Sequence, residues 1–188
     1  MSEVISELLQ QVGLAKETSQ EVALHFQPRL FKKGELFVKE GVVSQHMAYI
    51  HVGLMQYFFN LDGEEKTSYV TGDKTFAASL NSFLKGVPAK ENVRAITDVE
   101  AYLIHKSDLD TLKITNSGFQ NFYVAMVEQL ILCIDESRYK LMMLTAEQRY
   151  LAMMKDEPQL LQQIPLQYLA SVLGVTPRHL SRIRAEIR

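Results

Sequence analysis

The feature that most restricts how this chain can fold is a five-residue segment near its end, Leu-Gly-Val-Thr-Pro at positions 173–177. Gly174 is expected to end one helix, because a tight turn there needs a positive φ that other residues resist. Thr176 is a favourable N-cap, and Pro177 suits the first position of the next helix, where a missing N–H costs nothing. The segment therefore predicts two short helices joined by a tight turn, a helix-turn-helix, within residues 163–188.

Small and apolar residues surround this turn at the spacings that such a motif needs. Ala170 is small where the two helices are expected to cross closely. Val175, Leu180 and Ile183 are expected to fill the angle between the helices, and Ile187 continues the same buried stripe. The second helix is thus expected to have one apolar face and one face that is free to contact another molecule.

The free face of the second helix suits the major groove of DNA. Arg178, Ser181 and Arg182 recur at i, i+3 and i+4, so they form one stripe. The arginines are planar donors that match guanine O6 and N7, and the serine hydroxyl can donate to a base or a phosphate. The alternative is an ordinary helical corner with a solvated arginine face. Residues beside the stripe that are expected to contact phosphates are Thr176, His179, Arg184 and Arg188.

Charge and composition limit where nucleic acid could bind. The chain has 188 residues, of which 47% are hydrophobic, and a net charge of −2. No basic coat covers the whole protein, so DNA binding would depend on a local patch. Such a patch exists from Thr176 onward, where four arginines stand against one glutamate. The acidic remainder is expected to repel phosphate and to help orient the protein on DNA.

The residue content also disfavours several classes of protein. The single cysteine, Cys133, allows no intramolecular disulfide, iron–sulfur site or zinc finger, and we expect it to be a small buried residue on a helix. The acidic N-terminal segment lacks the features of a signal peptide, and no stretch reaches the roughly 18 apolar residues of a membrane span. The protein is therefore expected to be soluble and cytoplasmic, with no membrane partner.

The first half of the chain changes from a helical to a β pattern. Residues 3–26 predict a helical lead-in that breaks at Gly13, with a second helix starting at Thr18 or Ser19. From residue 28 to about 105, short apolar and β-branched runs alternate with glycine turns, which indicates a sandwich or barrel. Asp62-Gly63 is the best hairpin candidate. Strands are expected at 29–31, 36–39, 47–52, 54–60, 66–70, 93–96 and 101–104.

Residues 117–144 predict one long helix. Its apolar residues recur at spacings of three and four and widen beyond one stripe, so the helix must be buried on more than one side. One side can cover the β-domain, and the other is expected to contact a second copy of the chain. The alternative is a helix sunk in its own domain. The residues expected to form the dimer contact are Phe119, Tyr123, Met126, Val127, Leu130 and Ile134.

A further helix is expected from Ala146 to Lys155. Thr145 can cap its N-terminus, and Pro158 is expected to end that region. The sequence therefore places a β-domain, a long helix and a helical C-terminal unit in this order.

This order resembles the catabolite-activator (Crp–Fnr) family of bacterial regulators. The β-region shares that family's turns, among them Glu40-Gly41, Asp62-Gly63-Glu64-Glu65 and Gly72-Asp73, and residues 169–183 resemble its DNA-reading unit. The resemblance implies an α+β protein with an N-terminal double-stranded β-helix (jelly-roll) sensor domain at 1–116. A dimerisation helix at 117–144 and a DNA-binding domain at 145–188 would follow it.

The same resemblance implies a homodimeric transcription regulator that reads an inverted repeat in double-stranded DNA. RNA polymerase and a small-molecule effector are then further expected partners. The base-reading positions would be Arg178, Ser181 and Arg182. The family usually continues into a β-hairpin wing, whereas this chain stops at Arg188, so either the wing is absent or the chain is a truncated product.

The effector region departs from the family pattern. Members that bind cyclic AMP carry a Gly-Glu pair for the ribose and a Pro-Arg pair for the phosphate. Here Ala78 or Ser79 stands at the acid position, and Ala89 follows the proline. Cyclic AMP is therefore not the expected effector, because its phosphate would lose a bidentate partner. The residues expected to line any effector pocket in this degenerate domain are Ser79, Leu80, Asn81, Lys90 and Arg94.

Other chemistries have little support in the sequence. The single cysteine excludes the cysteine cluster of the oxygen-sensing branch. His46, His51 and His105 are expected to be ordinary strand or loop histidines instead of haem or metal ligands. No nucleophile elbow, P-loop or dinucleotide fingerprint occurs, so an enzyme is not expected. The remaining alternative is a small-molecule or cyclic-nucleotide sensor whose main output is not DNA binding.

Overall fold

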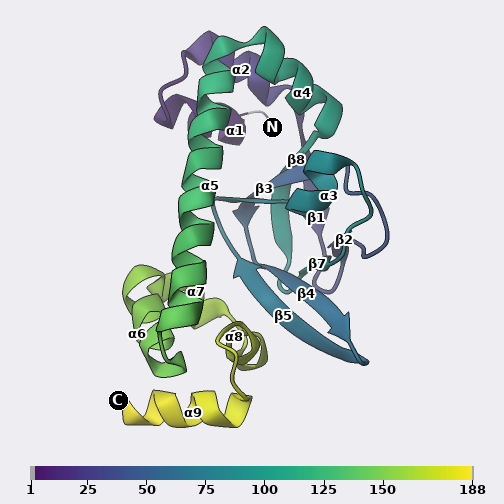
Figure 1. Ribbon diagram of the computed structural model, residues 1–188. Helices are drawn as coiled ribbons and strands as arrows, with labels where there is room; N and C mark the ends of the chain where they lie inside the picture. Colours follow the sequence, from purple (N-terminus) through teal and green to yellow (C-terminus); the bar gives the residue numbers. More distant parts are fainter. Residues whose placement is uncertain (1–2, 188) are drawn as a thin grey trace.

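Eight strands form two antiparallel sheets in the first part of the chain (Figure 1). The structure, a computed structural model, describes residues 3–187. The strands are β1 (Phe26–Phe31), β2 (Leu36–Val38), β3 (His46–Val52), β4 (Met55–Leu61), β5 (Glu64–Thr71), β6 (Thr75–Ala77), β7 (Asn92–Ala95) and β8 (Val99–His105). One sheet has the order β1-β8-β3-β6 and the other the order β2-β7-β4-β5. The predicted α+β class with an N-terminal β-roll is therefore confirmed.

Apolar side chains from both sheets fill the interior of the β-roll. Val93 and Ala95 of β7 are 0% and 1% exposed and belong to this core, together with Ala48 and Ile50 of β3. Successive strand residues point to opposite faces, so Arg94 lies on the outer face of its sheet. Apolar side chains of the protein therefore fill the space between the two sheets.

Two turns show why glycine is required where it occurs. Asp62 and Gly63 connect β4 to β5 with φ angles of 53° and 82°, and a two-residue hairpin turn needs positive φ at both positions. Gly53 has a φ of 107°, and a Cβ atom there would lie 2.4 Å from the carbonyl oxygen of Asp98. The predicted Asp62-Gly63 hairpin is therefore confirmed.

Some element boundaries differ from the predictions. Phe26, expected in the helical lead-in, begins β1, and its side chain is buried in the core. The second helix starts at Lys16 instead of Thr18 or Ser19. The predicted break at Gly13 is confirmed, with a φ of 96°.

Three short elements have no strong sequence signal. They are β6, α3 (Leu80–Lys85) and α4 (Lys106–Thr115), which lie in segments without a clear helical or strand period. Helix α6 (Ala146–Asp156) ends just before Pro158, as expected, and Pro158 then begins a further helix, α7 (Pro158–Gln163), because the first position of a helix tolerates proline.

A helical layer covers one end of the β-roll and extends beyond it (Figure 1). It consists of α1 (Glu3–Gln11), α2 (Lys16–Ala23), α4 and the first half of α5 (Ser117–Met143), which share a buried core with β1, β3 and β8. The second half of α5 runs on to the C-terminal helices. Cys133 lies on this part and is exposed, which corrects the prediction that it is buried.

The C-terminal unit contains α6 (Ala146–Asp156), α7, α8 (Leu166–Val172) and α9 (Pro177–Glu186). The prediction for α6 is confirmed, including the cap: the Thr145 hydroxyl accepts from the Gln148 N–H, and the Gln148 side chain accepts from the Thr145 N–H. Its core contains Leu169, Leu180 and Ile183, but also Leu54 and Val70 of the β-roll. These helices are therefore packed directly onto the sheet that contains β4 and β5.

Candidate nucleic-acid interface

Helices α8 and α9 form the predicted helix-turn-helix. At the end of α8 the N–H of Gly174 donates to Ser171 O and the N–H of Val175 donates to Ala170 O, a pair of bonds that needs the φ of 68° at Gly174. The Thr176 hydroxyl then accepts from the His179 N–H at 3.2 Å and begins α9. The turn therefore has the chemistry that the sequence predicts.

Buried contacts fix the angle between the two helices. Ala170 and Leu180 are 0% exposed and Ile183 is 4% exposed, while Val175 and Ile187 are partly buried against the same core. Burying a side chain such as Leu180 contributes about 1.5–3 kcal/mol. These contacts therefore hold α8 and α9 together as one rigid unit.

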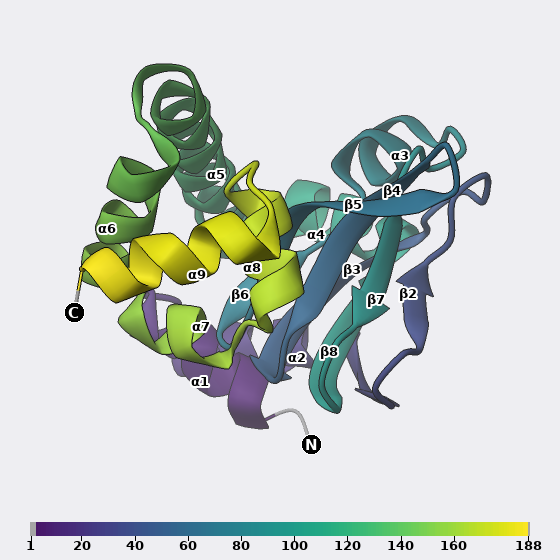
Figure 2. The same ribbon diagram turned by 90° about the horizontal axis from the view of Figure 1, so that it is seen from below.

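The opposite face of α9 points to solvent. Figure 2 shows α9 at the surface, lying across the other C-terminal helices. Arg178, Ser181 and Arg182 are all exposed, as expected for a stripe at i, i+3 and i+4. The Ser181 hydroxyl donates to Pro177 O at 2.9 Å, so its oxygen is left to accept from a partner. The structure thus brings the three predicted base-reading residues onto one accessible face.

The residues predicted to contact phosphates differ in their exposure to solvent. Thr176 and His179 are exposed at the start of α9. Arg184 is partly buried, and its Nε donates to the Tyr150 hydroxyl at 3.2 Å, with the guanidinium over the ring. Arg184 is thereby tied to α6. Arg188 lies outside the described residues.

Arg149 joins the ends of three helices, a role for which the sequence has no recognisable signal. From α6, it donates to Leu144 O at the end of α5 and to Leu173 O at the end of α8, both at 2.6 Å. Terminal helix carbonyls have no partner within their own helix, and a cation near them is also favoured by the helix dipole. Arg149 therefore holds the helix-turn-helix to the long helix.

A second unforeseen contact joins the helix-turn-helix to the β-roll. The Ser171 hydroxyl of α8 accepts from the Thr67 N–H at 2.9 Å and donates to Thr67 O at 3.1 Å. Thr67 lies on β5, the edge strand of its sheet, so these backbone groups have no neighbouring strand to pair with. The Ser171 hydroxyl therefore satisfies both the N–H and the C=O of Thr67.

The region expected to bind an effector is partly occupied by the protein's own groups. Ser79 is 1% exposed at the start of α3, while Leu80, Asn81 and Lys90 are exposed. The Tyr57 hydroxyl, from β4, accepts from the Ala78 N–H at 3.1 Å, and burial raises the pKa of this phenol well above its ordinary range. A backbone donor next to α3 is therefore already satisfied.

Arg94 is not brought together with this region. Its two terminal nitrogens lie 2.9 and 2.5 Å from the carboxylate oxygens of Glu65, and one also donates to Gln56 Oε1 at 2.9 Å. Its guanidinium lies over the Phe58 ring at 4.5 Å. These contacts place Arg94 on the outer face of its sheet, away from the roll interior, which corrects its prediction as an effector residue.

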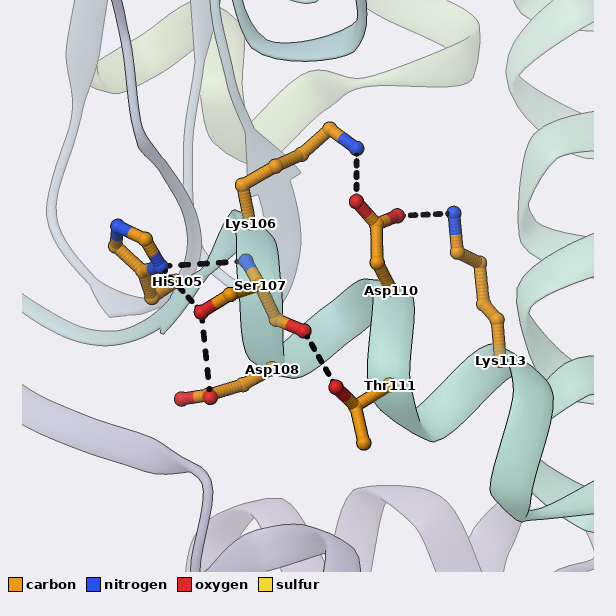
Figure 3. Close-up of polar contacts among 7 residues, drawn as sticks. All are labelled: His105, Lys106, Ser107, Asp108, Asp110, Thr111 and Lys113. Carbon is orange, nitrogen blue, oxygen red and sulfur yellow. Dashed lines mark hydrogen bonds and ion pairs between the residues drawn. The ribbon is translucent and has the colours of Figure 1, made fainter.

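His105, one of the three histidines considered as ligands, caps a helix. His105 Nδ1 accepts from the Ser107 N–H at 3.2 Å and caps α4, and it lies 2.8 Å from the Ser107 hydroxyl (Figure 3). Asp108 contacts Ser107 and not the histidine, so the three residues do not form a triad in which an acid orients the base. Within the part of the chain that the structure describes, no three His, Cys, Asp or Glu residues are grouped to hold a metal ion.

Two ion pairs strengthen the same helix. Asp110 lies between Lys106 and Lys113, at 2.5 and 2.6 Å (Figure 3). The hydrogen bond from Lys106, and then that from Lys113, lower the pKa of the Asp110 carboxyl. The two pairs thus connect Asp110 to the preceding and to the following turn of α4.

The predicted dimer residues divide into two groups. Phe119 is 1% exposed and packs into the core of its own subunit, so it supports α5 from inside and does not face a second copy. Tyr123 and Met126 also pack partly against that core. Ile134, in contrast, is 51% exposed. An outward-facing apolar surface therefore begins only beyond the first turns of α5.

None of the helices in the described part of the chain is both long and apolar enough to cross a membrane. A comparison with curated protein sequences found no match.

Several solved structures match the whole fold. FixK2 from Bradyrhizobium japonicum superposes with a TM-score of 0.73 at 15% identity, covering 86% of this chain and 84% of FixK2. The c-di-GMP-responsive global regulator CLP of Xanthomonas campestris gives a TM-score of 0.70 at 16% identity, covering 92% of this chain and 91% of CLP.

A third similar structure is a protein assigned to the Crp/Fnr family of transcriptional regulators from Eubacterium rectale. Its TM-score is 0.67 at 13% identity, and the match covers 94% of this chain and 84% of that protein. Residues 28–116 match the family model for the cyclic nucleotide-binding domain. The first part of the chain therefore resembles the cyclic nucleotide-binding domain, and the chain as a whole has the fold of these solved regulators.

Proposed function

We propose that this protein is a sequence-specific, DNA-binding transcriptional regulator of the Crp–Fnr type. The observation that carries the proposal is the orientation of α9. Its apolar residues, Leu180 and Ile183, are buried, and this turns Arg178 and Arg182 to the surface with no acidic side chain paired to either in the described residues. Arginine is suited to such a role because it can donate two parallel hydrogen bonds to guanine.

The long helix supports a homodimer. Val124, Val127, Ile131 and Ile134 follow the alternating three- and four-residue spacing of a coiled-coil seam, and Leu141 lies one heptad after Ile134. Val124, Ile131, Ile134 and Leu141 are 48–61% exposed in the single chain, an unusual amount of apolar surface for one stripe. A second copy packed along this stripe would cover it.

A dimer would present two α9 helices to DNA. Two recognition helices related by a two-fold axis read half-sites about 34 Å apart, one helical turn of DNA. The operator should therefore be an inverted repeat. The four arginines after Thr176 would supply a local positive charge in a chain whose net charge is −2.

We also propose that cyclic AMP does not control this regulator. Ala89 stands where an arginine would hold the cyclic phosphate, and Arg94 is paired with Glu65 on the outside of the sheet. The Tyr57 hydroxyl occupies the Ala78 N–H. Calorimetry with cyclic AMP and cyclic GMP should show no binding in the micromolar range, and binding at that strength would refute this part of the proposal.

The decisive experiment for DNA binding is selection of bound sequences from random duplex DNA. The expected result is an inverted repeat with half-sites one helical turn apart. Failure to enrich any sequence at low salt would refute the proposal and favour a sensor whose output is not DNA binding. The salt dependence of affinity should also be measured, because phosphate contacts release counterions.

A further inference from the structure

Four hydrogen-bonded polar residues form a row from the centre of one sheet to the helix-turn-helix. Arg94 of β7 donates to Gln56 of β4, and the Gln56 amide donates to the Thr67 hydroxyl of β5 at 2.8 Å. The Thr67 backbone in turn exchanges two hydrogen bonds with the Ser171 hydroxyl of α8. Gln56 is 0% exposed and Thr67 is 5% exposed, so water has little access to compete with these bonds.

The contact between Thr67 and Ser171 lies beside an irregularity in β5. Tyr57 pairs with Tyr69, and Phe58 pairs with Thr67, so Ser68 is an extra residue that forms a β-bulge. A bulge locally bends and twists its strand. It lies directly beside Thr67, the position at which α8 meets the sheet edge.

From this arrangement we infer that Ser171 is a positioning residue: its two bonds to Thr67 set the orientation of the recognition helix relative to the β-roll. The inference rests on the proposed function, because orientation matters only if α9 reads DNA. It goes beyond that function by naming the contact that determines how the two half-sites of a dimer are spaced.

The geometry of the helix-turn-helix transmits this contact. Ser171 lies one position after Ala170, where α8 and α9 cross, and Leu180 is fully buried at the same crossing. A rotation of α8 therefore moves α9 with it. Arg149 holds the end of α8 at Leu173. These two polar contacts, one on the roll and one on the long helix, add directional bonds to the apolar core that packs α8 on β5, so loss of the Ser171 bonds leaves the angle of the unit less strictly fixed.

The contact itself can be tested without DNA. In Ser171→Ala the Thr67 amide loses its acceptor, so its native-state hydrogen exchange should accelerate about fivefold, which corresponds to one ordinary hydrogen bond of about 1 kcal/mol. Ser171→Thr retains a hydroxyl and should restore protection. Circular dichroism establishes that both variants fold. Unchanged exchange at Thr67 in Ser171→Ala would overturn the inference at its first step.

The positioning role requires a spacing experiment on the full-length protein. The selected inverted repeat is prepared with its half-sites moved apart or together by one and two base pairs. The native protein should reject the altered spacings, whereas Ser171→Ala should bind them with at least tenfold less discrimination. Ser171→Thr should behave like the native protein. A merely structural role would weaken binding to all spacings equally, and that result would overturn the inference.

The two hypotheses fail in different ways. If native protein and Ser171→Ala bind the selected operator with the same strict spacing, the positioning role is wrong while DNA binding stands. If the native protein binds no duplex, the proposed function fails and the positioning role fails with it, although hydrogen exchange would still report the Ser171–Thr67 contact.

Discussion

The guanidinium of Arg149 lies 2.6 Å from the carbonyl oxygen of Leu173, and the two residues belong to α6 and to the end of α8. The same guanidinium reaches Leu144 O at the end of α5. The Arg149 Nε atom is buried without a partner in the described residues, so the side chain is held by its two terminal nitrogens alone. Arg149 is therefore the residue through which the long helix and the helix-turn-helix share one attachment.

Arg149→Met should destabilise the C-terminal unit. Hydrogen bonds to charged groups contribute about 1.5–3 kcal/mol, and the variant also leaves two helix carbonyls without a partner. Urea denaturation measures the loss. Arg138→Met is the matched control on α5, because the Arg138–Asp135 pair is exposed and such pairs contribute little. Equal stability of the two variants would contradict the assigned role.

Arg182→Ala should reduce operator affinity by about 1–3 kcal/mol and relax specificity at one base pair in each half-site. Binding assays on every single-base variant of the operator measure both effects. Arg184→Ala is the comparison, because Arg184 is tied to Tyr150 and lies beside the exposed stripe. It should weaken binding to all sequences alike. A base-specific effect of Arg184→Ala, with none from Arg182→Ala, would show that Arg184 reads the base and that the assignment to Arg182 is wrong.

Much of this architecture could be predicted from local patterns. The turn at Gly174, the cap at Thr176 and the hairpin at Asp62-Gly63 each depend on the chemistry of a few adjacent residues, and each is confirmed. Cys133 was misplaced because burial of a helix face depends on what packs against it, and α5 extends beyond the β-roll.

The contacts that organise the candidate site could not be predicted in the same way. Ser171 and Thr67 are 104 residues apart, and Arg149 and Leu173 are 24 residues apart. No periodicity or spacing links such pairs. Arg94 illustrates the converse problem, because a basic residue near an expected phosphate site is a plausible ligand until strand alternation places it on the outer face.

Ile131→Glu should prevent the proposed homodimer from forming. Ile131 is 59% exposed and lies at the centre of the proposed seam, where two facing carboxylates would repel each other without solvation by bulk water. Sedimentation equilibrium measures the change. Leu132→Glu is the matched control, since Leu132 is 60% exposed but lies off the seam on the same helix. Dissociation caused by Leu132→Glu and not by Ile131→Glu would place the interface on the other side of α5.

Stability should decrease as the pH falls below about 6.5. Burial lowers the pKa of His46 from its usual 6.5, and the neighbouring His105, whose ring centroid is 5.0 Å away, lowers it further. The unfolded chain therefore binds a proton at this position more readily than the folded one, and stability is lost as the pH falls through the folded pKa. Urea denaturation at pH 7.5 and 5.5 measures the difference. His46→Gln should reduce it, and exposed His179→Gln should not.

The coverage of the β5 edge by α8 has a consequence for any shortened form of the protein. Without its C-terminal helices, the β-roll would expose the N–H and C=O of Thr67 beside Leu54 and Val70, which those helices bury. An uncovered strand edge next to apolar surface is a template for intermolecular β-pairing. A fragment ending before Ala146 should therefore aggregate, because the C-terminal helices also serve as the cover of this sheet edge.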